Sequence, residues 1–413
     1  MIIKNLEITD LTEEGNGVGR HEGKVIFVKD ALPGELVNVR VTHSRKKFDQ
    51  GEVVEYLKQS SVRDEPFCKH YGICGGCSLQ HIDYKEGLNF KANWVKSAFS
   101  KIGRIKIEEP SIVGMENRLK YRNKVVFHGF FVEGKYSLGF YRKGSNSFVP
   151  ISECWLIPDS FIVIKNRIEE LATLYNVFPE EIMLRSNGVD FQINLFCGHE
   201  DNLDLLFCDL KREFPSIVDN IIFGIGGLSF EVSPKSFFQV NLEVAISLFS
   251  IVEKMMGDLS SSIIYDLCCG VGSIGIFLGK AGAKVKGYEV VEEAIVLARK
   301  NAEVNGLVGY DFTAGRVEDV ISASLFEANS VAILDPPRGG IDPFVIESLI
   351  KSKVDRIVYV GCGLGKMVRD ISRLVEGGFV VSEVECVDMF PWTGHVETVV
   401  LMSRKDNNRT GKA

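Results

Sequence analysis

The sequence predicts an α/β protein whose second half is a doubly wound parallel sheet. Between residues 233 and 405, short apolar runs typical of buried strands alternate with helical patterns such as Glu292 to Val304. The strand candidates are 263–268, 284–289, 331–335 and 356–360. Two final runs, 380–387 and 395–402, are close enough in sequence to be antiparallel neighbours. We therefore expect one sheet with helices on both faces.

The first 59 residues have a different pattern and predict a small all-β barrel. Short apolar runs alternate with turn signals such as Gly15-Asn-Gly-Val-Gly19 and Leu32-Pro-Gly34. The predicted strands include residues 6–8, 24–28, 35–41 and 51–56.

Residues 60–232 predict a mixed α+β domain, with a helix near 84–101 and strands near 124–127 and 189–196. Basic residues alternate in this region, at Arg118, Lys120, Arg122 and Lys124. On a strand they would share one face, which either contacts phosphates or is simply solvated. We expect the tail, residues 406–413, to be disordered.

The charge of the chain is unevenly distributed. The formal net charge of the 413 residues is −7, but residues 1–150 carry 24 Lys and Arg against 18 Asp and Glu. A basic front region on an acidic chain is consistent with a surface that binds a polyanion. No apolar run is long enough to cross a bilayer, and the N-terminus lacks a signal-peptide pattern, so we expect a cytoplasmic protein.

A glycine-rich turn marks a cofactor site in the second half. Tyr265-Asp-Leu-Cys-Cys-Gly270-Val-Gly272-Ser-Ile-Gly275 follows a predicted strand and opens a helix, and Glu289 ends the next strand. Glycines let the backbone approach a ligand, and the acid can accept both hydroxyls of a ribose. The spacing suits a dinucleotide and S-adenosylmethionine equally.

Asp335-Pro-Pro-Arg338 ends another predicted strand at the same edge of the sheet. The prolines fix the backbone and hold the carboxylate near the crevice. A dehydrogenase has no obvious need for this turn, which disfavours a nicotinamide cofactor. Arg338 could contact a phosphate or the edge of a base.

Cys362 follows the strand-like run 355–360 and has a glycine on each side. A thiol at the tip of a buried strand is placed to act as a nucleophile. Glu397 lies one hairpin later, after Phe390-Pro-Trp-Thr-Gly-His-Val, and by itself predicts only an ordinary strand carboxylate.

Cys68, Cys74 and Cys77 form a compact cluster of thiols, and Cys154 could supply a fourth. Four thiolates suit either a tetrahedral zinc ion or an iron–sulfur cluster, and the spacing does not decide between them.

Taken together, these motifs resemble the RNA uracil-5-methyltransferase family over nearly the whole chain, and in particular its 23S ribosomal RNA enzymes. The segment from Leu11 to Arg20, with Ala31-Leu-Pro-Gly-Glu35, is similar to the family's TRAM domain, an OB-like RNA-binding barrel. The resemblance implies three domains and a tail: TRAM at 1–59, a central iron–sulfur domain at 60–232, a Rossmann-like methyltransferase domain at 233–405, and the tail at 406–413.

The resemblance also assigns roles to individual residues. Cys362 matches the family's nucleophile and Glu397 its general base. The implied ligands of a [4Fe-4S] cluster are Cys68, Cys74, Cys77 and Cys154. The implied contacts of S-adenosylmethionine are Gln239, Cys268, Ser273, Glu289 and Asp335.

The chain departs from the family pattern at several of these positions. Cys268 stands where an aromatic residue is usual, and Ser273 is the polar residue of the glycine loop. The usual Ser-Cys-Asn-Pro around the nucleophile is Gly361-Cys362-Gly363-Leu364 here, and Trp392 replaces a smaller or polar residue. None of these changes removes a catalytic group.

The predicted activity is methylation of C5 of a uridine in structured RNA through a covalent bond between Cys362 and C6 of the base. Ribosomal RNA is favoured over tRNA because the resemblance ties the TRAM domain and the cluster to the ribosomal enzymes. The alternatives are a tRNA T-loop methyltransferase, a non-catalytic RNA-binding or chaperone protein, and a nicotinamide-dependent oxidoreductase. We expect a monomer with structured RNA as its partner and no membrane association.

Overall fold

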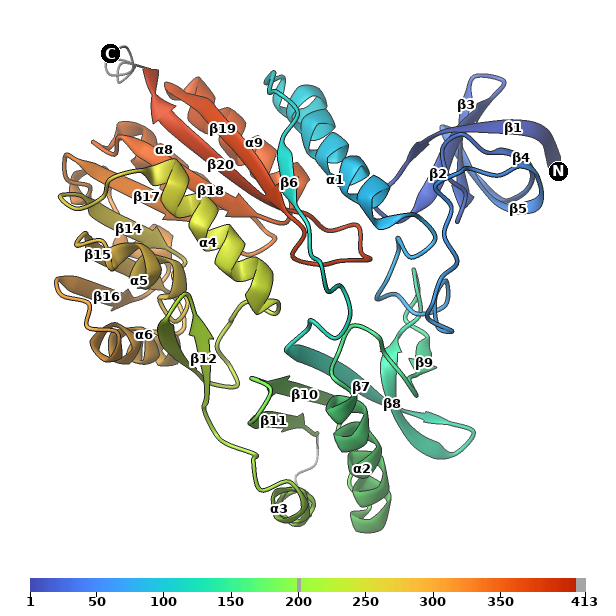
Figure 1. Ribbon diagram of the computed structural model, residues 1–413, viewed down its shortest axis with the longest axis horizontal. Helices are drawn as coiled ribbons and strands as arrows, with labels where there is room; N and C mark the ends of the chain where they lie inside the picture. Colours follow the sequence, from blue (N-terminus) through green and yellow to red (C-terminus); the bar gives the residue numbers. More distant parts are fainter. Residues whose placement is uncertain (199–201, 406–413) are drawn as a thin grey trace. The chain divides into compact units, whose positions relative to one another are not determined.

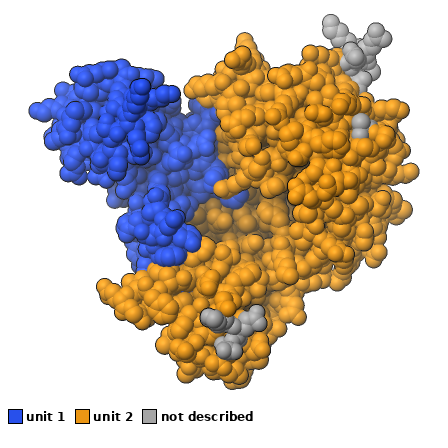
Figure 2. Space-filling view, turned by 180° about the vertical axis from the view of Figure 1, so that it is seen from behind, with its two compact units in different colours: residues 1–94, 138–154, 390–395 blue, residues 95–137, 155–389, 396–413 orange. Residues whose placement is uncertain are grey.

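The computed structural model describes residues 1–198 and 202–405, which form two compact units (Figure 2). Unit 1 contains residues 1–94, 138–154 and 390–395, and unit 2 contains the remaining described residues. The predicted tail at 406–413 lies outside the described residues, and the three-domain division stays a prediction. No helix in the described ranges has the length and apolar character needed to span a membrane.

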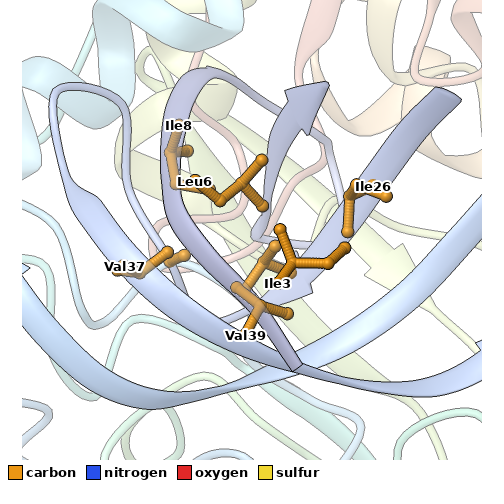
Figure 3. Packing of buried hydrophobic residues seen from close by; sticks show 8 residues of the cluster. Ile3, Leu6, Ile8, Ile26, Val37 and Val39 are labelled. Carbon is orange, nitrogen blue, oxygen red and sulfur yellow. The ribbon is translucent and has the colours of Figure 1, made fainter. Parts of the chain in front are cut away.

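Unit 1 begins with a closed barrel of five strands in the order β1-β2-β3-β5-β4 (Figure 1). The strands are β1 (Ile2–Leu11), β2 (Asn16–His21), β3 (Lys24–Lys29), β4 (Leu36–Ser44) and β5 (Phe48–Lys58). Alternate apolar side chains of these strands face inward and form the barrel core, which includes Ile3, Leu6, Ile8, Ile26, Val37 and Val39 (Figure 3). The predicted barrel is present.

The glycine-rich run at 15–19 is mostly a strand, where the sequence predicts a turn. Strand β2 pairs with both β1 and β3 and includes Gly17 and Gly19. A Cβ atom at Gly17 would lie 2.7 Å from the carbonyl oxygen of Ala31. Glycine is therefore needed here for a close approach inside the barrel, not for a turn.

The rest of unit 1 is loop-rich. Its regular elements are residues 84–94 of α1 (Tyr84–Ala98), the end of β8 (Lys135–Tyr141) and β9 (Phe148–Pro150). Strand β9 pairs antiparallel with β8. A short π-helical turn, Phe99–Gly103, extends α1 into unit 2. The predicted helix near 84–101 is confirmed.

Unit 2 contains an antiparallel sheet and a large mixed sheet. In the first, β10 (Glu181–Ser186) pairs with β7 (Lys124–Val132) and with β11 (Phe191–Phe196). The neighbouring helices are α2 (Asp159–Tyr175) and α3 (Leu203–Glu213), which pack against each other. A separate hairpin consists of β12 (Ile221–Ile225) and β13 (Leu228–Val232).

The four alternating basic residues do not share one strand, so that prediction is wrong. Strand β7 begins at Lys124, and residues 118–123 are irregular. Lys120 has a positive φ of 56°, and its Nζ atom lies 2.5 Å from Oδ1 of Asp159. A residue in the left-handed conformation interrupts the regular alternation of side chains along the chain. The backbone amides of Lys120 and Arg122 donate hydrogen bonds to the carbonyl oxygens of residues 155 and 156, and not to a neighbouring strand.

The large sheet has eight strands in the order β16-β15-β14-β17-β18-β20-β19-β6 (Figure 1). These are β14 (Ile263–Leu267), β15 (Lys284–Glu289), β16 (Tyr310–Ala314), β17 (Ser330–Leu334), β18 (Arg356–Gly361), β19 (Phe379–Val387), β20 (Glu397–Arg404) and β6 (Ser111–Val113). Strands β14 to β18 are parallel, and β20 is antiparallel to both β18 and β19. The predicted doubly wound sheet and its final hairpin are confirmed.

Helices cover both faces of this sheet (Figure 1). They are α4 (Leu242–Met256), α5 (Ser273–Gly279), α6 (Glu292–Val304), α7 (Val317–Val320), α8 (Pro343–Lys351) and α9 (Leu364–Glu376). Asp342 caps the start of helix α8 by accepting a hydrogen bond from the Phe344 amide at 2.8 Å. Helix α9 buries one apolar side, which includes Met367, Ile371 and Leu374.

The strand order reverses between β14 and β17. From β14 the chain first builds outward through β15 and β16, and then returns to add β17 and β18 on the other side. In open α/β sheets, ligands bind beyond the carboxyl ends of the strands at such a switch point. The edge of the sheet at the carboxyl ends of β14 and β17 is therefore the expected position of a ligand-binding site in unit 2.

Candidate active site

Four predicted site residues lie at this edge. Cys268 follows β14, Glu289 ends β15, Asp335 follows β17 and Cys362 follows β18. The parallel registers align these strand ends, with Leu267 beside both Tyr288 and Leu334. The carboxylates of Glu289 and Asp335 are close enough to raise the pKa of the Cys268 thiol, although burial is the larger cause.

Glu397 reaches the same edge from the opposite direction. Strand β20 begins at Glu397 and runs antiparallel to β18, and Thr398 pairs with Gly361. The start of β20 therefore lies beside the end of β18, which carries Cys362. These two residues are 35 positions apart in the sequence, and the hairpin brings them together.

The Cys362 thiol experiences opposing influences. Burial raises its pKa, and the neighbouring Glu397 and Asp335 raise it further. The Arg338 guanidinium lowers this pKa through its charge and a hydrogen bond to the thiol. Cys362 also stands two residues before the first residue of α9, whose N-terminus favours a negative charge. Arg338 and α9 are therefore the groups that favour the thiolate.

The two carboxyl groups near Cys362 are held in a buried environment. Burial raises the pKa of Glu397 well above its ordinary value, and Asp335 adds to that effect. Burial alone raises the pKa of Asp335 to about 7. The Asp335 carboxyl is thus poised to exchange a proton near neutral pH, and the raised pKa makes the Glu397 carboxylate a stronger base than usual. Shifts of this kind are a property of acid–base residues in active sites.

The glycine loop after β14 is fixed by two acidic side chains. The buried Asp266 accepts a hydrogen bond from the Gly275 amide at 2.9 Å, and a Cβ atom at Gly275 would lie 2.7 Å from the same carboxylate. Glu289 accepts hydrogen bonds from the amides of Gly270 at 3.2 Å and Val291 at 3.0 Å. The loop is therefore held rigidly against the ends of β14 and β15.

The space beside this loop is open. A Cβ atom built at Gly270 would meet no heavy atom within 4 Å. Ser273 is partly exposed at the first position of α5. Glycines, a helix start and a neighbouring acid form a cradle of the kind that receives an adenosine group.

Cys268 adopts a left-handed backbone conformation, with φ of 71°. Such a conformation is costly for a residue with a side chain, and it occurs often at functional sites. Burial raises the pKa of its thiol to about 12, so the side chain is a neutral thiol and not a second nucleophile.

Gln239 is buried in the segment that precedes α4. The Asn123 side chain donates a hydrogen bond to the Gln239 carbonyl oxygen at 2.9 Å, and the Asn123 amide donates to Val240 at the same distance. The start of β7 thus holds the Gln239 segment.

Two residues of this site were not predicted from the sequence. Asp266 lies inside the glycine motif but was not singled out, although an acid two residues before the loop was visible. Asp370 lies on α9, and its Oδ2 atom accepts hydrogen bonds from the Ile341 amide at 3.0 Å and the Tyr359 hydroxyl at 2.9 Å.

Asp370 therefore joins the two loops that carry Arg338 and Cys362. Ile341 lies three residues after Arg338, and Tyr359 lies three residues before Cys362. No sequence signal marks Asp370, because its partners are a backbone amide and a distant hydroxyl.

The four predicted metal ligands all belong to unit 1. Burial, together with smaller effects of Cys154, Cys74 and Cys68, raises the pKa of Cys77 to about 12, so the four thiols lie near one another. Among the described residues, however, no three His, Cys, Asp or Glu side chains stand in a metal-holding arrangement. Four thiols are donors that suit either a zinc ion or an iron–sulfur cluster, so the cluster stays a prediction.

Comparisons with known proteins extend over the whole chain. A family model described as tRNA (uracil-5-)-methyltransferase matches residues 224–405, and a TRAM domain model matches residues 3–54. A protein of Listeria innocua, named as an uncharacterized RNA methyltransferase, is 33% identical over 441 residues, and the match covers 97% of each chain. A similarly named protein of Clostridium acetobutylicum is 34% identical, with 97% and 96% covered.

A solved structure has the same fold. The tRNA (uracil-54, C5)-methyltransferase of Pyrococcus abyssi, in complex with S-adenosyl-L-homocysteine, matches with a TM-score of 0.74 and 23% identity. The match covers 96% of this chain and 99% of that one.

Proposed function

Because the chain belongs to the tRNA (uracil-5-)-methyltransferase family and is an RNA methyltransferase, we propose that it methylates C5 of one specific uridine in RNA through Cys362. The observation that carries this proposal is the meeting of Cys362, Arg338, Asp335 and Glu397 at one edge of the sheet. A thiol beside a cation and two buried carboxyls is the set of groups that this reaction requires.

Cys362 activates the base. C5 of uracil is a poor nucleophile, so the thiolate first adds to C6, and the ring becomes an enolate with negative charge at C5. Arg338 supports the thiolate before the addition. Because C6 is inaccessible in a stacked base, the uridine must leave the stack to reach the thiol.

Glu397 completes the reaction. S-adenosylmethionine supplies an electrophilic methyl group: C5 forms a bond to the methyl carbon while the bond from that carbon to the sulfonium sulfur breaks, and S-adenosylhomocysteine leaves. Glu397 then takes the proton from C5, the bond between C6 and the Cys362 sulfur breaks, and the thiolate leaves. The raised pKa of Glu397 suits this step, because a stronger base accepts the proton more readily. Asp335 orients the uracil or the cofactor.

The cofactor is held by residues of unit 2. We assign its binding to Gln239, Cys268, Ser273, Glu289 and Asp335, with the open glycine cradle beside them. Glu289 is suited to the ribose hydroxyls, because it ends β15 next to the loop.

The four cysteines of unit 1 are proposed to hold a [4Fe-4S] cluster. Support comes from their mutual electrostatic influence and from the choice of thiolate donors. We assign the cluster a role in folding or in RNA docking. Loss of methyl transfer on oxidation of the cluster, with fold and RNA affinity unchanged, would oppose that role.

Ribosomal RNA is the proposed substrate class, with a tRNA uridine as the alternative. The TRAM barrel together with a four-cysteine site favours the ribosomal RNA, whereas the Pyrococcus abyssi enzyme of the same fold is named for position 54 of tRNA. The proposal includes a monomer that acts in the cytoplasm.

Nucleoside mass spectrometry tests the activity and the substrate together. Unmethylated ribosomal RNA and tRNA are incubated separately with the reconstituted protein and S-adenosylmethionine. We expect new 5-methyluridine in the ribosomal RNA. Its appearance only in tRNA would reassign the substrate, and its absence from both, with cofactor bound, would favour a non-catalytic RNA-binding protein.

A further inference from the structure

Three cations of unit 2 gather, and none of them forms an ion pair within the described part of the chain. Arg185 is 1% exposed, and the antiparallel register places it directly opposite Lys124 on the neighbouring strand. Arg122, two residues before Lys124, is close enough to influence it. Residues directly opposite in a sheet point to the same face, and like charges in such a pair are destabilising.

Uncharged groups hold the Arg185 guanidinium. It donates hydrogen bonds to Oε1 of Gln192 at 3.0 Å and to the carbonyl oxygens of Ser233 and Ser236, each at 2.8 Å. Its Nε atom is buried without a partner, and so is the Nε atom of Arg122. A buried cation without a paired anion is expensive, so this arrangement requires an explanation.

One carboxylate, that of Glu181, influences Lys124 and also has another neighbour. Glu181 lies on β10, where its Oε2 atom is 3.8 Å from Nδ1 of His128. In the described ranges, neither Arg122 nor Lys124 makes a side-chain hydrogen bond or an ion pair. Both are only partly buried, so they can meet a ligand from solvent.

The cluster lies beside the proposed cofactor segment. Asn123, between the two partly buried cations, holds the backbone at Gln239 and Val240, and Arg185 holds Ser236 of the same segment. An anion bound here would therefore sit close to a part of the reaction site.

We propose that Arg122, Lys124 and Arg185 form an anion site that binds one backbone phosphate of the substrate RNA. Arg122 and Lys124 contact the phosphate directly, and the buried Arg185 contributes its charge from beneath. A phosphate supplies the missing negative charge, and phosphate contacts fix the register of an RNA on a protein without reading its sequence. This inference rests on the proposed function.

The charge state of Lys124 makes the site sensitive to pH. Burial, followed by the charge of Arg185, lowers the pKa of Lys124 to about 8. That value includes a raising effect of Glu181 and a smaller lowering effect of Arg122. The negative charge of a bound phosphate would raise the pKa of Lys124. Binding then takes up a proton, and RNA affinity should fall as the pH rises from about 7 to about 9.

Salt-dependent RNA binding tests the proposal. The probe is a fluorescein-labelled oligouridylate of about 12 nucleotides, titrated by anisotropy between about 50 and about 200 mM KCl. Lys124→Met should weaken binding by up to roughly tenfold and make the slope of log K against log salt shallower by about 0.7. Lys124→Arg should restore the slope and remove the fall in affinity at high pH.

Matched controls separate this role from a structural one. Lys351→Met removes an exposed lysine that has its own partner, Glu347, and should change neither slope nor affinity. Lys124→Met should leave the midpoint of thermal unfolding unchanged or raised, because it removes a like-charge pair. A lowered midpoint would instead assign Lys124 a packing role and overturn the proposal.

The remaining outcomes are also decisive. An unchanged salt slope in Lys124→Met, with wild-type RNA binding and methylation intact, would overturn the anion site alone. Weaker binding of S-adenosylhomocysteine by that variant, with the RNA slope unchanged, would reassign the site to the cofactor carboxylate. If the wild-type protein produced no 5-methyluridine in the same samples, the proposed function itself would fail.

Discussion

The thiol of Cys362 and the four thiols of unit 1 are the two sulfur centres of this protein, and their surroundings differ in charge. Burial raises the pKa of both Cys362 and Cys77. Cys362 has the Arg338 guanidinium to favour its thiolate, whereas Cys77 has three further thiols that disfavour its ionisation. A nucleophilic thiol needs a cation from the protein, whereas a set of metal-binding thiols obtains its positive charge from the metal.

Replacement of Cys362 and replacement of Cys77 should affect methyl transfer very differently, and this is the largest effect that we expect. Cys362→Ala should reduce methyl transfer by more than about 10³-fold, because no other group can add to C6. Cys77→Ser should lose bound iron but keep the turnover rate within about tenfold once RNA is saturating. Methyl-transfer kinetics and iron content, measured on both variants, check this contrast, and a catalytically dead Cys77→Ser would bring the cluster into the chemistry.

Glu397→Gln should separate the two halves of the reaction at the Cys362 centre. The amide cannot accept the C5 proton, so turnover should fall by about 10²- to 10⁴-fold. Cys362 can still add to C6, and a methylated covalent RNA adduct should accumulate on a denaturing gel. A variant that lost turnover without any adduct would show that Glu397 acts earlier than elimination.

Asp370→Asn should weaken the positioning of Cys362 and Arg338, although Asp370 itself is not expected to contact the substrate. The new amide group cannot accept both hydrogen bonds that now join the Arg338 loop to the Cys362 loop, so kcat should fall by about 10- to 100-fold. The KM for S-adenosylmethionine should not change. Tyr359→Phe is the milder control, since it removes only one of these bonds, and an equal loss in both variants would contradict a role shared between the loops.

Alkylation of metal-free protein by iodoacetamide should rank the two centres directly. Because the pKa of Cys362 is raised, the fraction of Cys362 present as thiolate, and with it the alkylation rate, should increase only above the pH range where an ordinary cysteine ionises. Arg338→Met should shift this pH–rate profile to still higher pH, because Arg338 lowers the pKa of the thiol. Cys77 should react more slowly than Cys362, because its pKa is about 12. Peptide mass spectrometry follows each site, with the exposed Cys208 as an internal reference. Faster labelling of Cys77 than of Cys362 would reverse the comparison.

Much of the fold could be predicted because its signals are local. Strands 263–267 and 356–361 are apolar runs between turns, and the helix at 292–304 has one apolar side and a glycine stop. The barrel was also predictable, but β2 was not, because glycine signals both a turn and a close approach between strands. At Gly17 the close approach explains the residue.

The site could be predicted less completely, because some of its interactions join distant segments. Cys362 and the glycine loop stand at strand ends, which a sequence reveals. The association of Glu397 with Cys362 depends on the register of β20 against β18, and Asp370 depends on a hydroxyl and an amide from two other segments. Lys124 and Arg185 likewise lie opposite each other because β7 pairs with β10. The two residues are 61 positions apart in the sequence, so no local pattern indicates that they meet.

The most direct test of the central claim is a trapping experiment with RNA that contains 5-fluorouridine. Fluorine at C5 cannot leave as a proton, so the reaction should stop after methyl transfer with the RNA still bound to the protein. The account predicts a covalent adduct that requires S-adenosylmethionine for its stable form and maps by peptide mass spectrometry to Cys362. An adduct formed equally well by Cys362→Ala, or one mapped to a cysteine of unit 1, would contradict it.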